Sequence, residues 1–310
     1  MRGFAEAEFR GRLGKAQTLM AEAGIGAILL TTEPEFRYFS GFLTRFWESP
    51  SRPWFLILPA QGDPVAVIPS IGAALMQSTW VQDIRTWPAP DPRDEGVSLL
   101  VEALRETGGP VALPSGPESS LRMSLADYAR VQRDSGLTFR DDAGITARLR
   151  AIKSEAEIDK IRASCAVAGR SFARVPEIAR EGVALAQVFR DFQRLLLEEG
   201  AEFVSYLAGG AGPDGYGDVI SPASDVPLAR GDVLMLDTGA VRDGYFCDYD
   251  RNFAVGAPSA VAAGAHAQLI EATAAGFEAA RPGARACDVF AAMAAITGGG
   301  EEAGRLGHGL

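Results

Sequence analysis

The chain has 310 residues, more than the roughly 250–300 at which a single hydrophobic core stops growing, so two domains are expected. Its 47% hydrophobic and 23% charged residues exclude a disordered protein, and no apolar run is long enough to cross a bilayer. A net charge of −10 repels phosphate groups and argues against nucleic acid or anionic membranes as partners.

The N-terminal residues and the cysteines indicate the compartment. Residues 1–20 carry charges every few positions and lack the pattern of a secretory signal, which predicts a cytoplasmic protein. Cys165, Cys247 and Cys287 form no short Cys-x-x-Cys pair, so we expect buried free thiols and neither disulfides nor a thiolate zinc site.

The first half of the chain alternates helical and strand patterns: a helix at 5–23, strands at 25–32, 54–59 and 65–69, a helix at 95–106, and a strand within 108–117. This alternation predicts an α/β domain. Ser154 and Glu157 have the spacing of a capping box and predict the start of a new helix. We therefore expect one domain over 1–146 and a second over 147–310.

The second half combines two amphipathic helices with strands that follow one another closely. The helical stripes run from Ile158 to Phe172 and from Leu185 to Leu196. The strands are expected at 202–208, 233–237 and 244–250, with a glycine-rich segment at 209–218 and a helix pair at 258–280 and 286–296. Antiparallel strands with helices predict an α+β domain.

The segment 234–253 carries the most informative polar residues. An apolar strand ends in Asp237, and after a turn the returning strand carries Asp248 and Asp250. A turn at Arg242-Asp243 would oppose Asp237 to Asp248, whereas a turn at Asp243-Gly244 would oppose it to Asp250. Period-two alternation places Asp248 and Asp250 on one face in either register.

Carboxylates opposed in a hairpin lie about 5 Å apart at their Cβ atoms and repel each other unless a cation lies between them. Hard divalent cations meet that need, and two-metal hydrolytic sites hold their ions about 3.5–4 Å apart. The alternative interpretation is a solvated strand face carrying Asp248 and Asp250, with Asp237 merely capping a turn.

The chain has two histidines. His266 lies in a helical stretch with Leu269 and Ile270, where a histidine is usually packed or half exposed, so it is not expected to bind an ion. His308 lies between Gly307 and Gly309, and glycines let the backbone approach an ion or substrate closely. Taken alone, Gly-His-Gly is most often a plain loop.

Three segments in this order resemble the pita-bread metallopeptidases, the family of creatinases, prolidases, Xaa-Pro aminopeptidases and methionine aminopeptidases. They are RLRAIKSEAEIDKIR (148–162), RGDVLMLDTGAVRDGYFCDYDRNF (230–253) and GRLGHGL (304–310). Residues 1–145 resemble the N-terminal domain of the creatinase, prolidase and aminopeptidase P branch. The resemblance implies an α/β N-terminal domain followed by an α+β pita-bread domain that is incomplete at its C-terminus.

The resemblance also implies a metal site. Asp237 would bind one ion, Asp248 would bridge two, and His308 would supply an imidazole to the other. Hairpin register and family position together favour Asp248 over Asp250. Two glutamates further along complete the site in this family, so we expect the coding sequence to continue beyond Leu310. The cofactors implied are two divalent metal ions, with manganese first and iron, cobalt or zinc as alternatives.

Two departures from the family concern substrate chemistry. Peptidases of this branch usually carry a histidine before the first metal aspartate, and segment 215–228 has none. Asp250 stands where threonine is more common, either as a further acceptor near the ligands or as a surface carboxylate, the interpretation we prefer. The aromatic loop Phe42–Ser51, with Phe46 and Trp47, is a hypothetical contribution to a neighbour's site.

The function implied by the resemblance is that of a metal-dependent hydrolase similar to Xaa-Pro aminopeptidase or prolidase, which cleaves a small peptide or amide with a metal-activated water. The expected assembly is a homodimer. One alternative is a creatinase-like C–N hydrolase or a lyase of the same fold. Another is a non-catalytic binding relative, if the chain ends at Leu310. No residue is assigned a catalytic role or a role in binding an organic cofactor.

Overall fold

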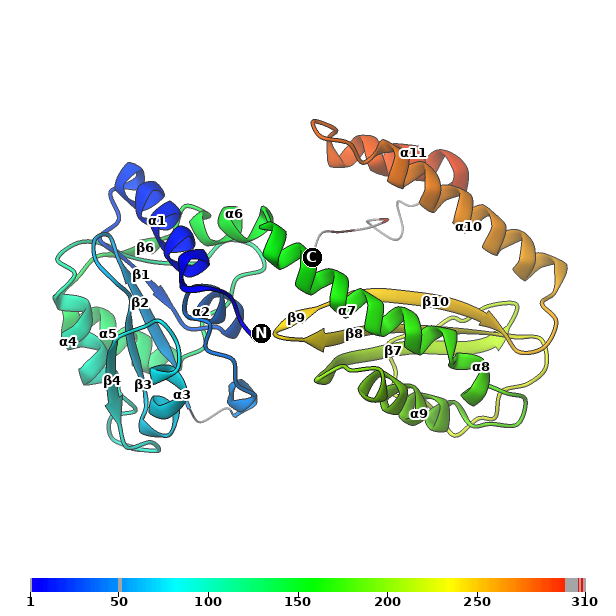
Figure 1. The fold of residues 1–310 in the computed structure, drawn as a ribbon, viewed down its shortest axis with the longest axis horizontal. Coiled ribbons are helices and arrows are strands. Elements are labelled where there is room, and N and C mark those ends of the chain that lie inside the picture. The colour runs from blue at the N-terminus through cyan, green and yellow to red at the C-terminus, as the bar shows by residue number, and fades with distance from the viewer. Residues whose placement is uncertain (1, 50–51, 299–305, 307, 309–310) are drawn as a thin grey trace. The chain divides into compact units, whose positions relative to one another are not determined.

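The computed structural model describes residues 2–49 and 52–298 together with Leu306 and His308. The chain divides into two compact units, Met1–Ser154 and Glu155–Leu310 (Figure 1). The helices of the first unit are α1 (Glu6–Ala23), α2 (Glu33–Ser40), η1 (Phe46–Glu48), η2 (Ser70–Gly72), α3 (Ala73–Gln77), α4 (Val97–Arg105), α5 (Leu125–Ser135) and α6 (Ile145–Ala151). Its strands are β1 (Ala27–Leu30), β2 (Phe55–Pro59), β3 (Val65–Pro69), β4 (Asp83–Trp87), β5 (Val111–Leu113) and β6 (Phe139–Asp141).

The first unit is built on a six-stranded mixed sheet in the order β4-β3-β2-β1-β5-β6. The strands β1, β2 and β3 pair antiparallel, and the outer pairings are parallel. Side chains of β1 alternate between two cores: Ile28 packs in a core with Met20 of α1, and Leu29 packs in a core with Leu100 of α4. Because both faces are buried there, the inner strands β1, β2, β3 and β5 are apolar throughout, whereas the edge strands β4 and β6 carry charged residues.

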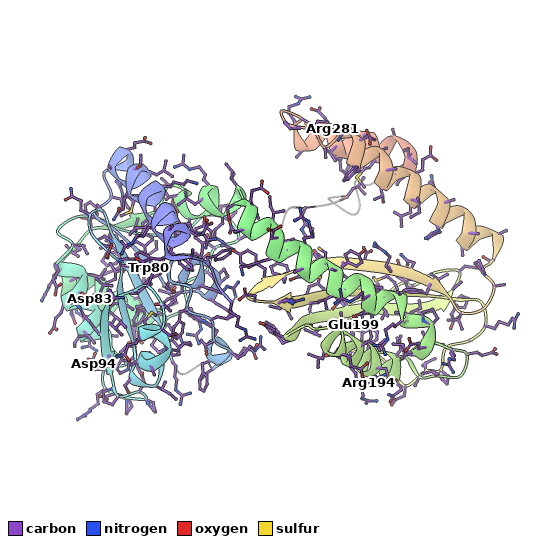
Figure 2. All side chains as sticks on the ribbon, viewed as in Figure 1. Trp80, Asp83, Asp94, Arg194, Glu199 and Arg281 are labelled. Carbon is purple, nitrogen blue, oxygen red and sulfur yellow. The ribbon has the colours of Figure 1, made fainter. Side chains whose placement is uncertain are left out.

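Aromatic rings fill much of the core next to α1. Trp80, labelled in Figure 2, stacks on Phe9 of α1 with ring centroids 6.4 Å apart. Its indole N–H donates to the carbonyl oxygen of Phe39 at 2.8 Å. A large ring can be buried here because its polar atom has a partner.

The second unit contains the helices α7 (Glu155–Ala173), α8 (Val175–Ile178), α9 (Leu185–Glu198), α10 (Ala260–Ala279) and α11 (Ala286–Thr297). Its strands are β7 (Phe203–Pro213), β8 (Asp232–Arg242), β9 (Tyr245–Phe246) and β10 (Tyr249–Ala254). They form an antiparallel sheet in the order β10-β8-β7, with β9 also paired to β8. Helix α7 begins directly after Ser154, as its capping-box spacing predicted.

One face of this sheet packs on α7 and α9 (Figure 1). Leu234 and Leu236 of β8 share a core with Phe172 of α7 and Phe192 of α9, whose rings lie 4.8 Å apart. Glu199, labelled in Figure 2 after the end of α9, accepts a 2.8 Å hydrogen bond from Arg170 Nε of α7. Because strand side chains alternate, Met235 and Asp237, which lie on either side of Leu236, face away from the helices.

Strand β7 is longer than predicted. The expected strand ended at residue 208, but β7 continues through glycines to Pro213. The following segment folds back, so that Gly209 donates its backbone N–H to the carbonyl oxygen of Val219 at 2.9 Å. A Cβ on Gly210 would lie 2.4 Å from the carbonyl oxygen of Asp218, so this return requires glycine at residue 210.

Candidate functional site

The hairpin that carries the aspartates turns at Asp243 and Gly244. Their φ angles of 49° and 76° both lie in the left-handed region, as a type I′ turn requires. The ladder then pairs Val241 with Phe246 and Asp237 with Asp250. Of the two registers compatible with the sequence, this is the one that opposes Asp237 to Asp250. The register argument in favour of Asp248 was therefore wrong.

Asp248 lies in the short connection between β9 and β10, and its side chain is nevertheless on the same face of the sheet as that of Asp237. The preceding residue, Cys247, is fully buried in the core shared with α7 and α9. Its backbone N–H donates to the carbonyl oxygen of Ala240 at 3.1 Å, which keeps the chain in register across the break. Alternation then directs Asp248 to the opposite face.

Tyr206 of β7 connects the two carboxylates, and the sequence analysis missed it. Its hydroxyl oxygen lies 3.1 Å from Asp237 Oδ1 and 2.5 Å from Asp248 Oδ1. A phenol has one proton to donate, so the two contacts share it in a three-centre arrangement. Side chains from β7, β8 and the β9–β10 connection therefore meet at one atom.

A β-bulge places the Tyr206 ring over β8. The register of β7 against β8 shifts between Val204 and Leu207, so Ser205 and Tyr206 lie opposite Gly239. A Cβ on Gly239 would lie 2.4 Å from Ser205 Oγ and 2.5 Å from Tyr206 Cε1. A glycine two residues after Asp237 is the sequence signal that could have indicated a side chain crossing the strand here.

Burial and like charges perturb the acid–base properties of this cluster. Burial raises the pKa of Asp237 above its usual range, the hydrogen bond from Tyr206 opposes that rise, and the neighbouring Asp248 and Asp250 add to it. Burial likewise raises the pKa of Tyr206, reinforced by its hydrogen bond to Asp248. Tyr206 therefore remains a neutral donor between two acids.

His308 contacts the same cluster. Its Nε2 atom lies 2.8 Å from Asp248 Oδ2, the oxygen that does not contact Tyr206. At this distance the contact is an ordinary hydrogen bond or ion pair between the imidazole and the carboxylate. Two carboxylates and an imidazole are also donors that divalent transition metals accept. Within residues 2–49, 52–298, 306 and 308, however, no three His, Cys, Asp or Glu side chains are grouped closely enough to hold an ion, so the structure joins these donors in pairs: Asp237 with Asp248 through Tyr206, and Asp248 with His308.

The segment that lacks the expected histidine lies on the same face of the sheet. Burial and the charge of Asp250 raise the pKa of Tyr216, which lies close to Asp250 and Asn252. Asp218 Oδ1 accepts from the backbone N–H groups of Ile220 and Ser221 at 3.0 and 3.1 Å. A side-chain hydrogen bond from Ser221, together with these two, lowers the pKa of Asp218.

Other expected features lie outside this cluster. His266 is exposed on α10. The cysteines are free, as predicted, but only Cys247 is buried; Cys165 is partly buried and Cys287 is exposed, because α11 contributes no residue to a core.

The structure describes residues 42–49 of the aromatic loop 42–51, with residues 50 and 51 outside the described part, and it separates core residues from surface residues there. Phe42 is fully buried and Trp47 is 7% exposed, so both belong to the core of the first unit. Phe46 is 46% exposed. Of these three rings, Phe46 is the one whose surface could meet another molecule.

No described helix is both long enough and apolar enough to span a membrane.

Two family profiles match the chain in succession. The profile described as Creatinase/Prolidase N-terminal domain matches residues 12–152, and that described as Metallopeptidase family M24 matches residues 159–310. The Probable dipeptidase PepE of Mycobacterium tuberculosis is 31% identical, over 100% of this chain and 81% of its own length. The Xaa-Pro dipeptidase of Pyrococcus furiosus is 29% identical over 54% of this chain and 48% of its own length.

Solved structures agree with these matches. Dipeptidase PepE from Mycobacterium ulcerans superposes with a TM-score of 0.75 and 27% identity, covering 97% of this chain and 78% of that one. A recombinant prolidase from Thermococcus sibiricus superposes with a TM-score of 0.80 and 21% identity, covering 97% and 79%. The expected resemblance is confirmed, and with it the fold class of an α/β N-terminal domain followed by an α+β pita-bread domain.

Proposed function

The chain belongs to metallopeptidase family M24, and we propose that it is a metal-dependent dipeptidase whose ion ligands include Asp237, Asp248 and His308. Its hydrolase class follows from the family and from relatives named dipeptidase and Xaa-Pro dipeptidase. The observation that carries the proposal is the cluster itself. Asp248 Oδ1 accepts a hydrogen bond from the Tyr206 hydroxyl at 2.5 Å, and Asp248 Oδ2 lies 2.8 Å from His308 Nε2.

The chemistry of this face suits a small charged substrate. A divalent ion, when bound, would act as a Lewis acid and lower the pKa of a coordinated water. Asp237 and Asp248 supply hard oxygen donors and His308 Nε2 supplies a nitrogen donor. The exposed carboxylate of Asp250, opposite Asp237, adds a negative charge that attracts the free ammonium group of an unblocked dipeptide.

Hydrolysis assays on the full chain test the proposal. The protein is stripped with a chelator and assayed on dipeptides with and without proline in second position, before and after addition of Mn²⁺, Co²⁺, Fe²⁺ or Zn²⁺. We expect activity only with metal, Mn²⁺ being the first candidate, and a loss of more than about 100-fold in Asp237→Asn. The matched control is Asp225→Asn, an exposed carboxamide substitution in the same unit that should leave the rate unchanged.

The outcome also separates the alternatives. The absence of histidine from segment 215–228 favours an enzyme of the same fold that acts on a non-peptide substrate. Cleavage of creatine, with no cleavage of any dipeptide, would support this alternative. A wild-type chain that binds no divalent ion at near-stoichiometric level and hydrolyses nothing would contradict the proposal and leave a binding protein. The expected homodimer is tested by sedimentation velocity on the same sample.

A further inference from the structure

Hydrogen bonds of the bulge anchor Tyr206 to the central strand β8. Its backbone carbonyl accepts a 3.0 Å hydrogen bond from Thr238 Oγ1, and Ser205 Oγ donates to the carbonyl oxygen of Gly239 at 2.6 Å. These two bonds fix the bulge of β7 against the central strand β8. The absence of a side chain on Gly239 leaves the space that the ring occupies.

The phenol divides the oxygens of the two carboxylates into two sets. Asp237 Oδ1 and Asp248 Oδ1 both contact the Tyr206 hydroxyl. Asp248 Oδ2 instead faces His308 Nε2. One oxygen of the shared carboxylate is thus occupied by a protein donor while the other remains directed at the imidazole.

A neutral hydroxyl can orient these carboxylates without cancelling their charge. Its single proton is shared by two acceptors, so it orients the carboxylates of Asp237 and Asp248 while adding no positive charge. Groups that orient metal ligands in this way usually govern affinity without touching the ion.

We propose that Tyr206 is a positioning residue for divalent-ion binding: its hydroxyl holds the Asp237 and Asp248 carboxylates so that Asp248 Oδ2 is presented to the ion together with His308. This inference rests on the proposed function. According to this inference, Tyr206 of β7 sets the relative orientation of two carboxylates, that of Asp237 in β8 and that of Asp248 in the β9–β10 connection.

Tyr206→Phe tests the inference, because it removes one oxygen atom and keeps the ring. We expect the dissociation constant for Mn²⁺, measured by isothermal titration calorimetry, to rise about 10–100-fold. The visible absorption of the Co²⁺-loaded chain, which reports ligand geometry, should change as well. A purely structural role would lower the thermal midpoint and leave both metal readouts as in the wild type.

Tyr245→Phe is the matched control. Tyr245 also donates its hydroxyl to a carboxylate of this unit, Glu157 Oε1 at 2.7 Å, but this pair joins β9 to α7 on the other side of the sheet. Its removal should leave the Mn²⁺ affinity and the Co²⁺ spectrum unchanged. If the Tyr206→Phe variant failed to fold, Thr238→Val would replace it, because this change removes the hydrogen bond from Thr238 Oγ1 to the Tyr206 carbonyl oxygen. The Mn²⁺ affinity and the Co²⁺ spectrum would be measured on this variant in the same way.

Failure of the inference can be told apart from failure of the proposed function. A wild type that binds Mn²⁺ and hydrolyses dipeptides, with Tyr206→Phe equal to it in affinity and spectrum, overturns the inference alone. A wild type that binds neither Mn²⁺ nor Co²⁺ overturns both. Weaker binding and an altered spectrum in Tyr206→Phe, with Tyr245→Phe unchanged, support the positioning role.

Discussion

Gly239→Ala is the substitution for which the structure predicts the clearest combined effect on stability and on the site. The new Cβ would lie 2.4 Å from Ser205 Oγ and 2.5 Å from Tyr206 Cε1, where ordinary contacts begin near 3.4 Å. Gly239 does not have a positive φ angle, so space alone decides the outcome. Strand β8 is paired on both sides and cannot retreat, so the Tyr206 ring must turn away from the aspartates.

The expected cost follows from two terms. Overpacking of this kind typically destabilises a protein by about 1–3 kcal/mol. Loss of the hydroxyl contacts adds about 1 kcal/mol, a small value because Tyr206 is 36% exposed. We therefore expect the free energy of unfolding to fall by about 2–4 kcal/mol. The Mn²⁺ affinity should fall as in Tyr206→Phe.

The choice of probe matters in this assay. All four tryptophans, at positions 47, 54, 80 and 87, lie in the first unit. Urea unfolding should therefore be followed by far-UV circular dichroism, which includes the second unit, with tryptophan fluorescence as a separate record of the first. The control is Gly264→Ala in α10, where a Cβ meets no atom within 4 Å. That change should stabilise the helix by about 0.5–1 kcal/mol. A Gly239→Ala protein with wild-type stability and wild-type Mn²⁺ affinity would refute the reasoning.

Two further predictions concern the first unit. Trp47→Ala should lower the free energy of unfolding of this unit by about 3–5 kcal/mol, because Trp47 is 7% exposed and its ring centroid lies 5.1 Å from that of Phe36. Phe46→Ala should change the free energy of unfolding by less than about 0.5 kcal/mol, because Phe46 is 46% exposed. Equal losses for the two variants in urea titrations would contradict this prediction. Burial raises the pKa of Glu33, so its ionised form opposes folding: stability is highest below the unfolded pKa and declines as pH rises through the folded one. Glu33→Gln should therefore raise the thermal midpoint at pH 7 and show no advantage near pH 4; an advantage that grows on acidification would contradict the sign.

The elements that the sequence predicted are those with a broad apolar stripe. Helix α9 buries Leu185, Val188 and Phe192 at helical spacing, and the strands β2 and β3 are continuous apolar runs. Helix α5 was missed because Val131 and Ser135 are its buried residues, too few to make a periodic signal.

Helix α2 was missed for a different reason. The predicted strand 25–32 stops two residues before Pro34, and this proline lies in the first turn of the helix. Proline is well tolerated there because its missing N–H would have no partner within the helix. A strand followed at once by a helix therefore looks like a strand followed by a loop.

The proximity of Asp237 and Asp248 could be predicted from the sequence, but their shared contact with a phenol could not. Asp237 and Asp248 share a face whichever turn forms, so alternation alone was enough to bring them together. The position of Tyr206 depends on a bulge that shifts β7 by one residue between Val204 and Leu207. The residue pattern of β7 does not indicate where two of its residues oppose a single residue of β8. The contact between Tyr206 and the aspartates could therefore be found only from the structure.

The register of β8 explains how the sheet itself positions the Asp237 carboxylate. A slip of one residue would turn Leu234 and Leu236 out of the core and bury Asp237 among the helices α7 and α9, a costly exchange in both directions. The type I′ turn at Asp243-Gly244 specifies the same register independently. The position of Asp237 is thus set by the forces that stabilise the sheet, and only the orientation of its carboxylate is left for Tyr206 to determine.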